Sequence, residues 1–199
     1  VGSSGVSANI DATASAAVFD FEPPDSRTYV VEVKPAITLD AVVQMTEPNG
    51  VFHNEDWGAE GGTETALVDS AVKGRYLFVV TGFETTMGKF DVSVRPADMV
   101  ETDVGDTKSA TIDASNPAAV FEFDASDGRP LTISVEPDNS LHPVLQLIDP
   151  TGTSEEVSNF DEGGAVTLPV DGTAKGRYRV VVRGYKSTTG RFQLSVQAG

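Results

Sequence analysis

The sequence repeats itself at an offset of 102 residues. A period this long indicates tandem domains that each bury a core, because the repeats of solenoid proteins span only about 20–50 residues. We therefore predict two domains, residues 1–99 and 100–199, with an acidic linker at about 97–109. The segments that the offset aligns best are Ala17–Phe21 with Ala119–Phe123, Glu47–Gly50 with Asp149–Gly152, and Lys73–Tyr76 with Lys175–Tyr178.

Apolar residues alternate with polar ones in both copies, as in strands that bury one face. Near the end of each copy, Phe90, Val92 and Val94 alternate with polar residues, as do Phe192, Leu194 and Val196. The Glu-Pro-Asn-Gly and Asp-Pro-Thr-Gly segments predict tight turns, because proline presets φ and glycine accepts a positive φ. These patterns predict an all-β chain of two antiparallel β-sandwiches, and they leave jelly-roll and immunoglobulin-like topologies open.

Charge and composition exclude several kinds of partner and chemistry. The formal net charge is −16, from 14 basic and 30 acidic residues, so a nucleic acid is not expected as a partner. The chain has no cysteine, which excludes disulfides and thiolate metal sites. No apolar run approaches the roughly 20 residues that a membrane-spanning helix needs, so no membrane insertion is expected. Val1–Gly5 carries no charged-then-apolar signal region.

A series of turn, loop and strand residues recurs in the same order in both copies. In the first copy these residues are Asp40, Pro48, Gly50, Asn54, Asp56, Gly74, Tyr76, Gly82, Gly88 and Phe90. In the second copy they are Pro150, Gly152, Asn159, Asp161, Gly176, Tyr178, Gly184, Gly190 and Phe192. This order of motifs resembles the bacterial pre-peptidase C-terminal domain family. The resemblance implies a jelly-roll-like sandwich, secretion or a cell-envelope location, and an accessory binding role beside an exported enzyme. The second copy departs from the family pattern at His142, which occupies the position that Asp40 has in the first copy.

Sequence motifs of catalysis are weak, and we expect no enzyme activity. The two histidines, His53 and His142, lie at non-equivalent places in the two copies. Ser70 and Lys73 match a Ser-x-x-Lys pattern, but the segment precedes a strand where that motif needs a helix. We interpret it as a turn.

Calcium is the cofactor that the acidic composition favours, because calcium takes six to eight oxygen ligands from carboxylates, amides and carbonyls. The candidate ligand sets are Asp40 with Asn54 and Asp56; Asn159 with Asp161 and Glu162; and the acids Glu101, Asp103 and Asp106 of the linker, where calcium-binding members of the family use acidic residues. None has a diagnostic spacing. The alternative is that Asn54 and Asp56 cap their loop by bonding its backbone and that the linker is a hydrated acidic tether.

Aromatic residues of loops and turns are the candidates for ligand contact: Trp57, which lies in the variable loop as do Phe52 and Phe160, and Phe83 and Tyr185, which lie at matching turns. Such rings either anchor ligands or fold back as minor core. The leading hypothesis is a binding module whose partner is an extracellular polymer or protein, or the catalytic domain of the parent enzyme. The alternative is a structural spacer without a specific ligand.

Overall fold

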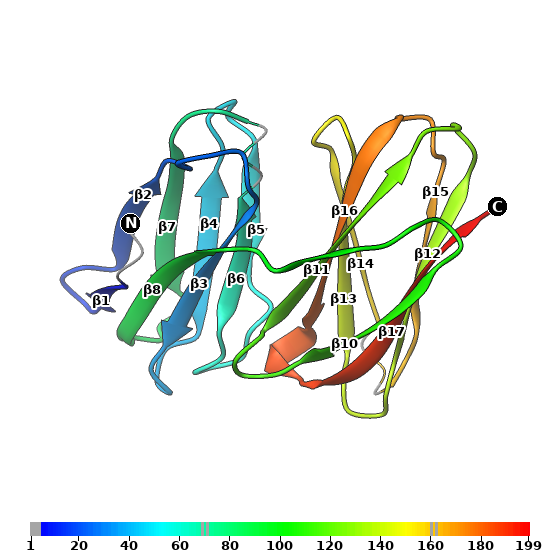
Figure 1. The fold of residues 1–199 in the computed structure, drawn as a ribbon. Coiled ribbons are helices and arrows are strands. Elements are labelled where there is room, and N and C mark those ends of the chain that lie inside the picture. Colours follow the sequence, from blue (N-terminus) through cyan, green and yellow to red (C-terminus); the bar gives the residue numbers. More distant parts are fainter. Residues whose placement is uncertain (1–4, 69, 71, 160, 162) are drawn as a thin grey trace. The chain divides into compact units, whose positions relative to one another are not determined.

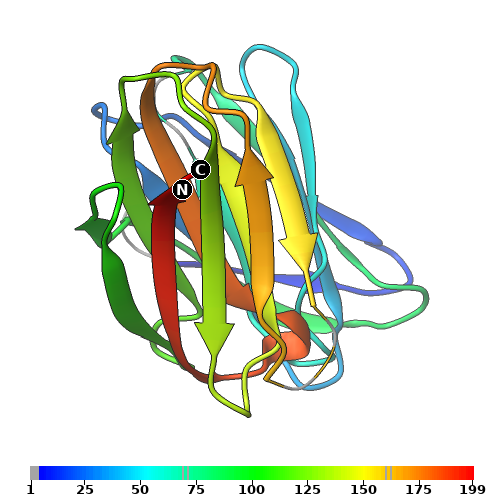
Figure 2. The same ribbon diagram turned by 90° about the vertical axis from the view of Figure 1, so that its right-hand side faces the viewer.

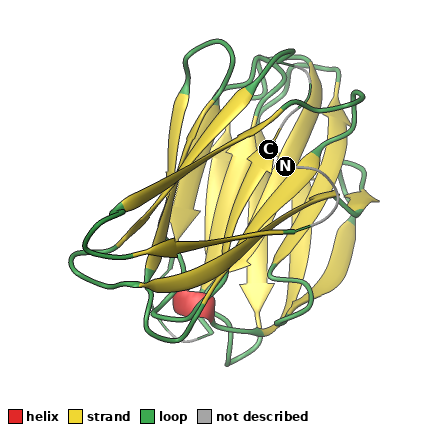
Figure 3. Ribbon diagram, turned by 90° about the vertical axis from the view of Figure 1, so that its left-hand side faces the viewer, coloured by secondary structure: helices red, strands yellow, loops and turns green. Residues whose placement is uncertain are grey.

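The computed structural model describes residues 5–68, 70, 72–159, 161 and 163–199, so Phe160 and Glu162 lie outside the described residues. Contacts divide the chain into two compact units, Val1–Ala97 and Asp98–Gly199. Strands make up nearly all of the regular structure, with one short helical turn (Figure 3). No helix in the described residues is long and apolar enough to cross a membrane.

The first unit is a sandwich of two antiparallel four-stranded sheets, with strand orders β1-β8-β3-β6 and β2-β7-β4-β5 (Figure 1). Its strands are β1 (Val6–Ile10), β2 (Ala16–Phe21), β3 (Tyr29–Pro35), β4 (Ala41–Thr46), β5 (Phe52–Glu55), β6 (Glu64–Val68), β7 (Tyr76–Gly82) and β8 (Gly88–Pro96). Eight strands in two such sheets form a jelly roll, whereas immunoglobulin domains have seven or nine strands in another order. The predicted all-β sandwich class is confirmed, and the topology is now resolved.

The second unit repeats this topology, with sheets β10-β17-β12-β15 and β14-β13-β16-β11-β9; Figure 2 shows the former sheet in front. Its elements are β9 (Met99–Glu101), β10 (Thr107–Ile112), β11 (Ala118–Ala125), β12 (Leu131–Pro137), β13 (Pro143–Ile148), β14 (Ser154–Ser158), β15 (Val166–Val170), β16 (Gly176–Gly184), the 3-10 turn η1 (Tyr185–Ser187) and β17 (Gly190–Ala198).

The stretch expected to be a linker, about 97–109, contains regular structure of the second unit. Residues 99–101 form β9, which pairs in parallel with β11, and residues 107–109 begin β10. Acidic residues surround this short strand, and Val100 is the only β-branched residue among 99–101, so the sequence pattern does not predict the strand.

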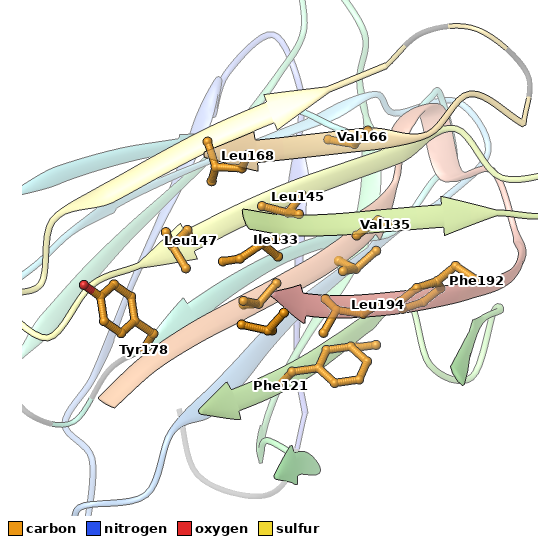
Figure 4. Close-up of a cluster of buried hydrophobic side chains, with 14 of the residues drawn as sticks. Phe121, Ile133, Val135, Leu145, Leu147, Val166, Leu168, Tyr178, Phe192 and Leu194 are labelled. Atoms are coloured by element: carbon orange, nitrogen blue, oxygen red, sulfur yellow. The ribbon is translucent and has the colours of Figure 1, made fainter. Parts of the chain in front are cut away.

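A separate apolar core fills each sandwich, built from the alternating residues that the sequence predicts to face inward. In the second unit Phe192, Leu194 and Val196 are at most 2% exposed, and Figure 4 shows several of these side chains in one cluster. In the first unit Phe90 and Val92 are each 2% exposed. The predicted tight turns are also present, since Gly50 and Gly152 have φ values of 90° and 87°.

Candidate functional site

An acidic pocket lies along the edge of the second unit where β9 pairs with β11. The parallel register places Glu101 beside Glu122, and the Thr102 N–H donates a hydrogen bond to the Glu122 carbonyl oxygen at 2.9 Å. The pocket has a volume of about 140 Å³ and is lined by Glu101, Thr102, Asp103, Glu122, Phe123, Asp124 and Arg177. Two of the acids predicted from the sequence therefore share this pocket with two acids of β11.

Arg177 neutralises part of this negative charge. Its Nη1 lies 3.5 Å from Glu122 Oε1, and its Nη2 lies 3.4 Å from Asp124 Oδ2. The hydrogen bond to Asp124 and the nearby carboxylate charges raise the pKa of Arg177. The other oxygen of Glu122, Oε2, is buried without a hydrogen-bond partner, and the residue is 7% exposed. An unsatisfied buried carboxylate oxygen is costly, so the pocket favours further positive charge.

Asp106, the third predicted acid of this stretch, does not line the pocket. Its carboxylate pairs with Lys108 at 3.0 Å, and this hydrogen bond lowers the pKa of Asp106. In the part of the chain that the structure describes, no group of three or more His, Asp or Glu side chains is placed to hold a metal ion as it stands. Glu101 and Asp103 would therefore need to change side-chain conformation to share a cation.

Asp40 and Asn54, two of the candidate ligands of the first unit, lie at different positions along the paired strands β4 and β5. Asn54 lies on β5 opposite Gln44 of β4, and Asp40 precedes that strand by one residue. Four residues of extended strand separate Asp40 from Gln44, which is roughly 13 Å at the usual rise. The structure thus keeps Asp40 apart from Asn54.

Asp56 and Trp57 belong to a loop that is held by a residue the sequence analysis did not single out. Glu64, which is 1% exposed, accepts hydrogen bonds from the backbone N–H groups of Trp57, at 3.1 Å, and of Gly58. Asp56 is partly buried, and this burial raises its pKa. Trp57 is also partly buried.

Asn159 caps its own loop. Its side-chain oxygen accepts a hydrogen bond from the Asp161 N–H at 2.9 Å, and its amide nitrogen donates to the Ala165 carbonyl oxygen at 3.0 Å. Both polar groups of Asn159 are therefore engaged by the loop backbone.

Phe83 and Tyr185 occupy equivalent turns at the ends of β7 and β16. The Phe83 N–H donates to the Asp40 carbonyl oxygen at 2.7 Å, and the Tyr185 N–H donates to the His142 carbonyl oxygen at 2.8 Å. Because the backbone makes this contact, an aspartate and a histidine can fill the same position of the repeat. Phe83 is 45% exposed and Tyr185 is partly exposed, so both rings are accessible at their turns.

Ser70 and His53, two residues of the types that act in catalysis, make contacts that stabilise the fold. The Ser70 hydroxyl is buried and donates a hydrogen bond to the Arg27 carbonyl oxygen, which ties the segment before β7 to the segment before β3. His53 Nε2 lies 3.0 Å from Glu47 Oε1 across the β4–β5 turn. The roles of Ser70 and His53 are therefore accounted for by the fold.

Comparison with known proteins gives similarity at the level of structure. No protein-family model matches this chain, and no curated protein matches it. The chain is similar to the pre-peptidase C-terminal domain of a collagenase from Bacillus anthracis, with 16% identity over 51% of this chain and 97% of that one and a TM-score of 0.44. It is also similar to CorA, a surface-associated copper-binding protein of Methylomicrobium album BG8, with 10% identity, coverage of 52% and 98%, and a TM-score of 0.39. A third similar structure is PliG, a periplasmic inhibitor of g-type lysozyme from Salmonella Typhimurium, with 20% identity, coverage of 51% and 98%, and a TM-score of 0.33.

Proposed function

We propose that this chain is a non-catalytic binding module of a secreted or cell-envelope protein, of the pre-peptidase C-terminal type, and that its second unit binds calcium. The observation that carries the cation proposal is the buried Glu122 Oε2, which has no hydrogen-bond partner in a pocket lined by three further acids. Calcium satisfies such oxygens because its ligands are carboxylates and carbonyls.

The ligands proposed for calcium are Glu101 and Asp103 together with Glu122 and Asp124. Glu101 and Asp103 are exposed and free to adjust, whereas Glu122 is held by the sheet. Arg177 competes for two of these carboxylates, so the affinity should be in the weak range of extracellular calcium modules, about 10⁻⁴–10⁻³ M. A site this weak fills only where calcium is plentiful, which agrees with an exported module.

The partner of the module is proposed to be an extracellular polymer or protein, or the catalytic domain of a parent enzyme. Phe83 and Tyr185 are the anchors proposed for this contact, because exposed rings supply much of the energy of binding surfaces. Trp57, which is partly buried, is proposed as an additional contact of the first unit. Two units on one chain would raise avidity if both bind the same polymer.

The cation proposal is tested by thermal unfolding of the whole chain in EDTA and in millimolar calcium. At ten times the dissociation constant, calcium adds about 1.4 kcal/mol to the stability of the second unit, which raises its melting temperature by roughly 5–10 °C. Glu122→Gln and Asp103→Asn should abolish this rise. Asp20→Asn, at the position of the first unit that matches Glu122, should leave it intact.

The spacer alternative makes the opposite prediction. If calcium leaves the melting temperature of the native chain unchanged, the cation proposal fails, and Arg177 is the positive charge that pairs with Glu122 and Asp124. The binding role then depends on Phe83 and Tyr185, and replacing both with serine should weaken capture by an extracellular polymer. A chain that acts only as a spacer binds no polymer before or after this change.

A further inference from the structure

A pocket of about 390 Å³ lies at the end of the second sandwich where β13 leads into β14 and β15 leads into β16. The apolar side of this end pocket is formed by Leu147, Val170, Ala174 and Tyr178. Figure 4 shows Leu147 and Tyr178 at one end of the apolar core. The end pocket therefore adjoins the core and offers an apolar wall to a ligand.

Carboxylates form the other side of the end pocket, and they belong to Asp149, Glu155 and Asp171. Glu155 pairs with Leu147 across β13 and β14, and opposed residues of antiparallel strands share one face of a sheet. Because Leu147 belongs to the core, Glu155 stands on the core-facing side of the edge strand β14. Its carboxylate makes no hydrogen bond or ion pair with the residues that the structure describes.

Asp149 and Asp171 each keep one carboxylate oxygen for a ligand. Asp149 Oδ1 accepts hydrogen bonds from the Thr151 N–H at 2.8 Å and the Thr153 N–H at 2.9 Å. Asp171 Oδ1 accepts a hydrogen bond from the Thr173 N–H at 3.0 Å. These bonds hold both side chains in place, and they leave the two Oδ2 atoms without a partner in the part of the chain that the structure describes.

The end pocket favours a cation that also has an apolar part. None of the described residues that line it is basic. Burial, followed by the negative charges of Asp149 and Asp171, raises the pKa of Tyr178, so both carboxylates act on the ring that forms the apolar wall. Because no group of three acids or histidines among the described residues is placed to hold a metal ion, the geometry suits a larger, organic cation.

The first unit neutralises the same place with a side chain of its own. The repeat aligns Asp149 with Glu47 and Glu155 with His53. His53 lies opposite the buried Met45, so it too stands on the core-facing side of its strand. Its Nε2 atom lies 3.0 Å from Glu47 Oε1, and the two side chains are only 15% and 12% exposed. The second unit has a carboxylate in place of this imidazole and therefore lacks the internal partner.

We infer that the end pocket binds a lysine side chain of a partner protein. A lysine ammonium group carries three donors, which matches three separate carboxylates, whereas the planar guanidinium of arginine is suited to a single carboxylate held in its fork. The aliphatic stem of the lysine then lies against the apolar wall. The inference rests on the proposed binding role and names a chemical group that the partner presents. The end pocket shares no lining residue with the pocket beside β9, so the lysine and calcium sites can fail separately.

The test uses the whole chain and Nα-acetyl-lysine amide, titrated to tens of millimolar at constant ionic strength and followed by backbone amide chemical shifts. We expect saturating shifts at residues 149–155 and 170–174 with a dissociation constant of about 1–10 mM, as for a small ligand with one charged group. Glu155→Gln should weaken this binding by about tenfold, because a hydrogen bond between charged groups is lost. Glu155→His, which introduces the residue pair of the first unit, should abolish it.

The matched control is Glu156→Gln, which removes the same charge from the opposite face of β14 and should leave the dissociation constant unchanged. The probe acetylated also at Nε keeps the stem without the charge and should give no saturating shifts. Absence of saturation with the native chain overturns the inference, as does equal weakening by Glu155→Gln and Glu156→Gln. Saturation of the same amides by calcium with release of the probe also overturns it, because the occupant is then a metal ion.

Discussion

The Tyr178 hydroxyl donates a hydrogen bond to the Ala174 carbonyl oxygen at 2.6 Å, and Tyr76 makes the same contact with Val72 at 2.9 Å. Both tyrosines are at most 1% exposed. Each hydroxyl therefore ties the segment before a central strand to the core of its own unit. The Gly-Arg-Tyr motif thus has a structural role in both copies.

Tyr178→Phe should destabilise the second unit by about 1–2 kcal/mol, because it removes one hydrogen bond and leaves the Ala174 carbonyl oxygen without this donor. Urea unfolding followed by amide signals of each unit measures the loss. Tyr76→Phe is the matched variant and should lower the stability of the first unit instead. Equal loss in both units from either variant would contradict separate cores.

Glu64→Ala should release the loop that contains Trp57, because the Trp57 and Gly58 amides lose their acceptor. We expect a loss of about 2–3 kcal/mol in the first unit. Trp57 is the single tryptophan of the chain, so its fluorescence reports on this loop directly, and the emission should shift to longer wavelength. Glu60→Ala, an exposed residue of the same loop, is the control and should leave the emission unchanged.

Gly184→Ala should lower the stability of the second unit more than Gly152→Ala does. A Cβ at Gly184 would collide with the carbonyl oxygen of Thr188 in the turn after β16, and that backbone cannot move without breaking the turn. A Cβ at Gly152 would meet no atom within 4 Å, so the second change costs only the strain of its positive φ, about 1 kcal/mol. Denaturant unfolding of both variants compares the two costs, and equal losses would show that the contact with Thr188 is easily relieved.

Each unit should fold without the other, because each has its own core. Residues 1–97 and 98–199, expressed separately, should each unfold cooperatively. A shorter piece that starts at residue 107 lacks β9 and should be less stable than 98–199, since the edge of β11 is then open. Circular dichroism melts measure all three. If either half is unfolded alone, the prediction of two independent domains is wrong.

The sequence predicts the core of this fold well, because alternating residues such as Phe192 and Leu194 have to face inward on any strand. It predicts the turns at Gly50 and Gly152 for the same local reason, namely that proline and glycine restrict φ. The choice of jelly-roll topology needed the pairing of β1 with β8, a contact between the two ends of a unit that no local pattern encodes.

The candidate sites were less predictable. Glu101 and Asp103 come from one segment, but their pocket partners Glu122 and Arg177 come from strands far along the chain. In the sequence, Glu122 is a polar residue between Phe121 and Phe123, a pattern that predicts only that its side chain faces away from the core. The signal that was present is the repeat itself, since Asp20 and Arg75 form the matching pair in the first unit. The sequence makes Asn159 a candidate calcium ligand, and in the structure its side-chain oxygen accepts a hydrogen bond from the Asp161 N–H.

The carboxylate of Asp25 should make the stability of the first unit depend on pH in acid. The side-chain hydrogen bond from Arg27 is the main cause that lowers the pKa of Asp25 to about 2, and the Tyr29 hydroxyl also donates to this carboxylate. A lowered pKa means that the folded state favours the charged form of Asp25. The contribution of Asp25 to folding stability is therefore fully present above the usual pKa of 3.8. This contribution is lost as the pH falls from 3.8 through about 2.

Arg27→Gln should therefore move the pKa of Asp25 back toward 3.8 and reduce stability in mild acid above that value. An NMR titration of the Asp25 carboxyl group measures the shift. Asp127, whose pKa is lowered by its own hydrogen bond from Arg129, is the internal control and should titrate as before in this variant. If Asp25 titrates near 3.8 in the native chain, the hydrogen bond from Arg27 is too transient in water to hold the charge.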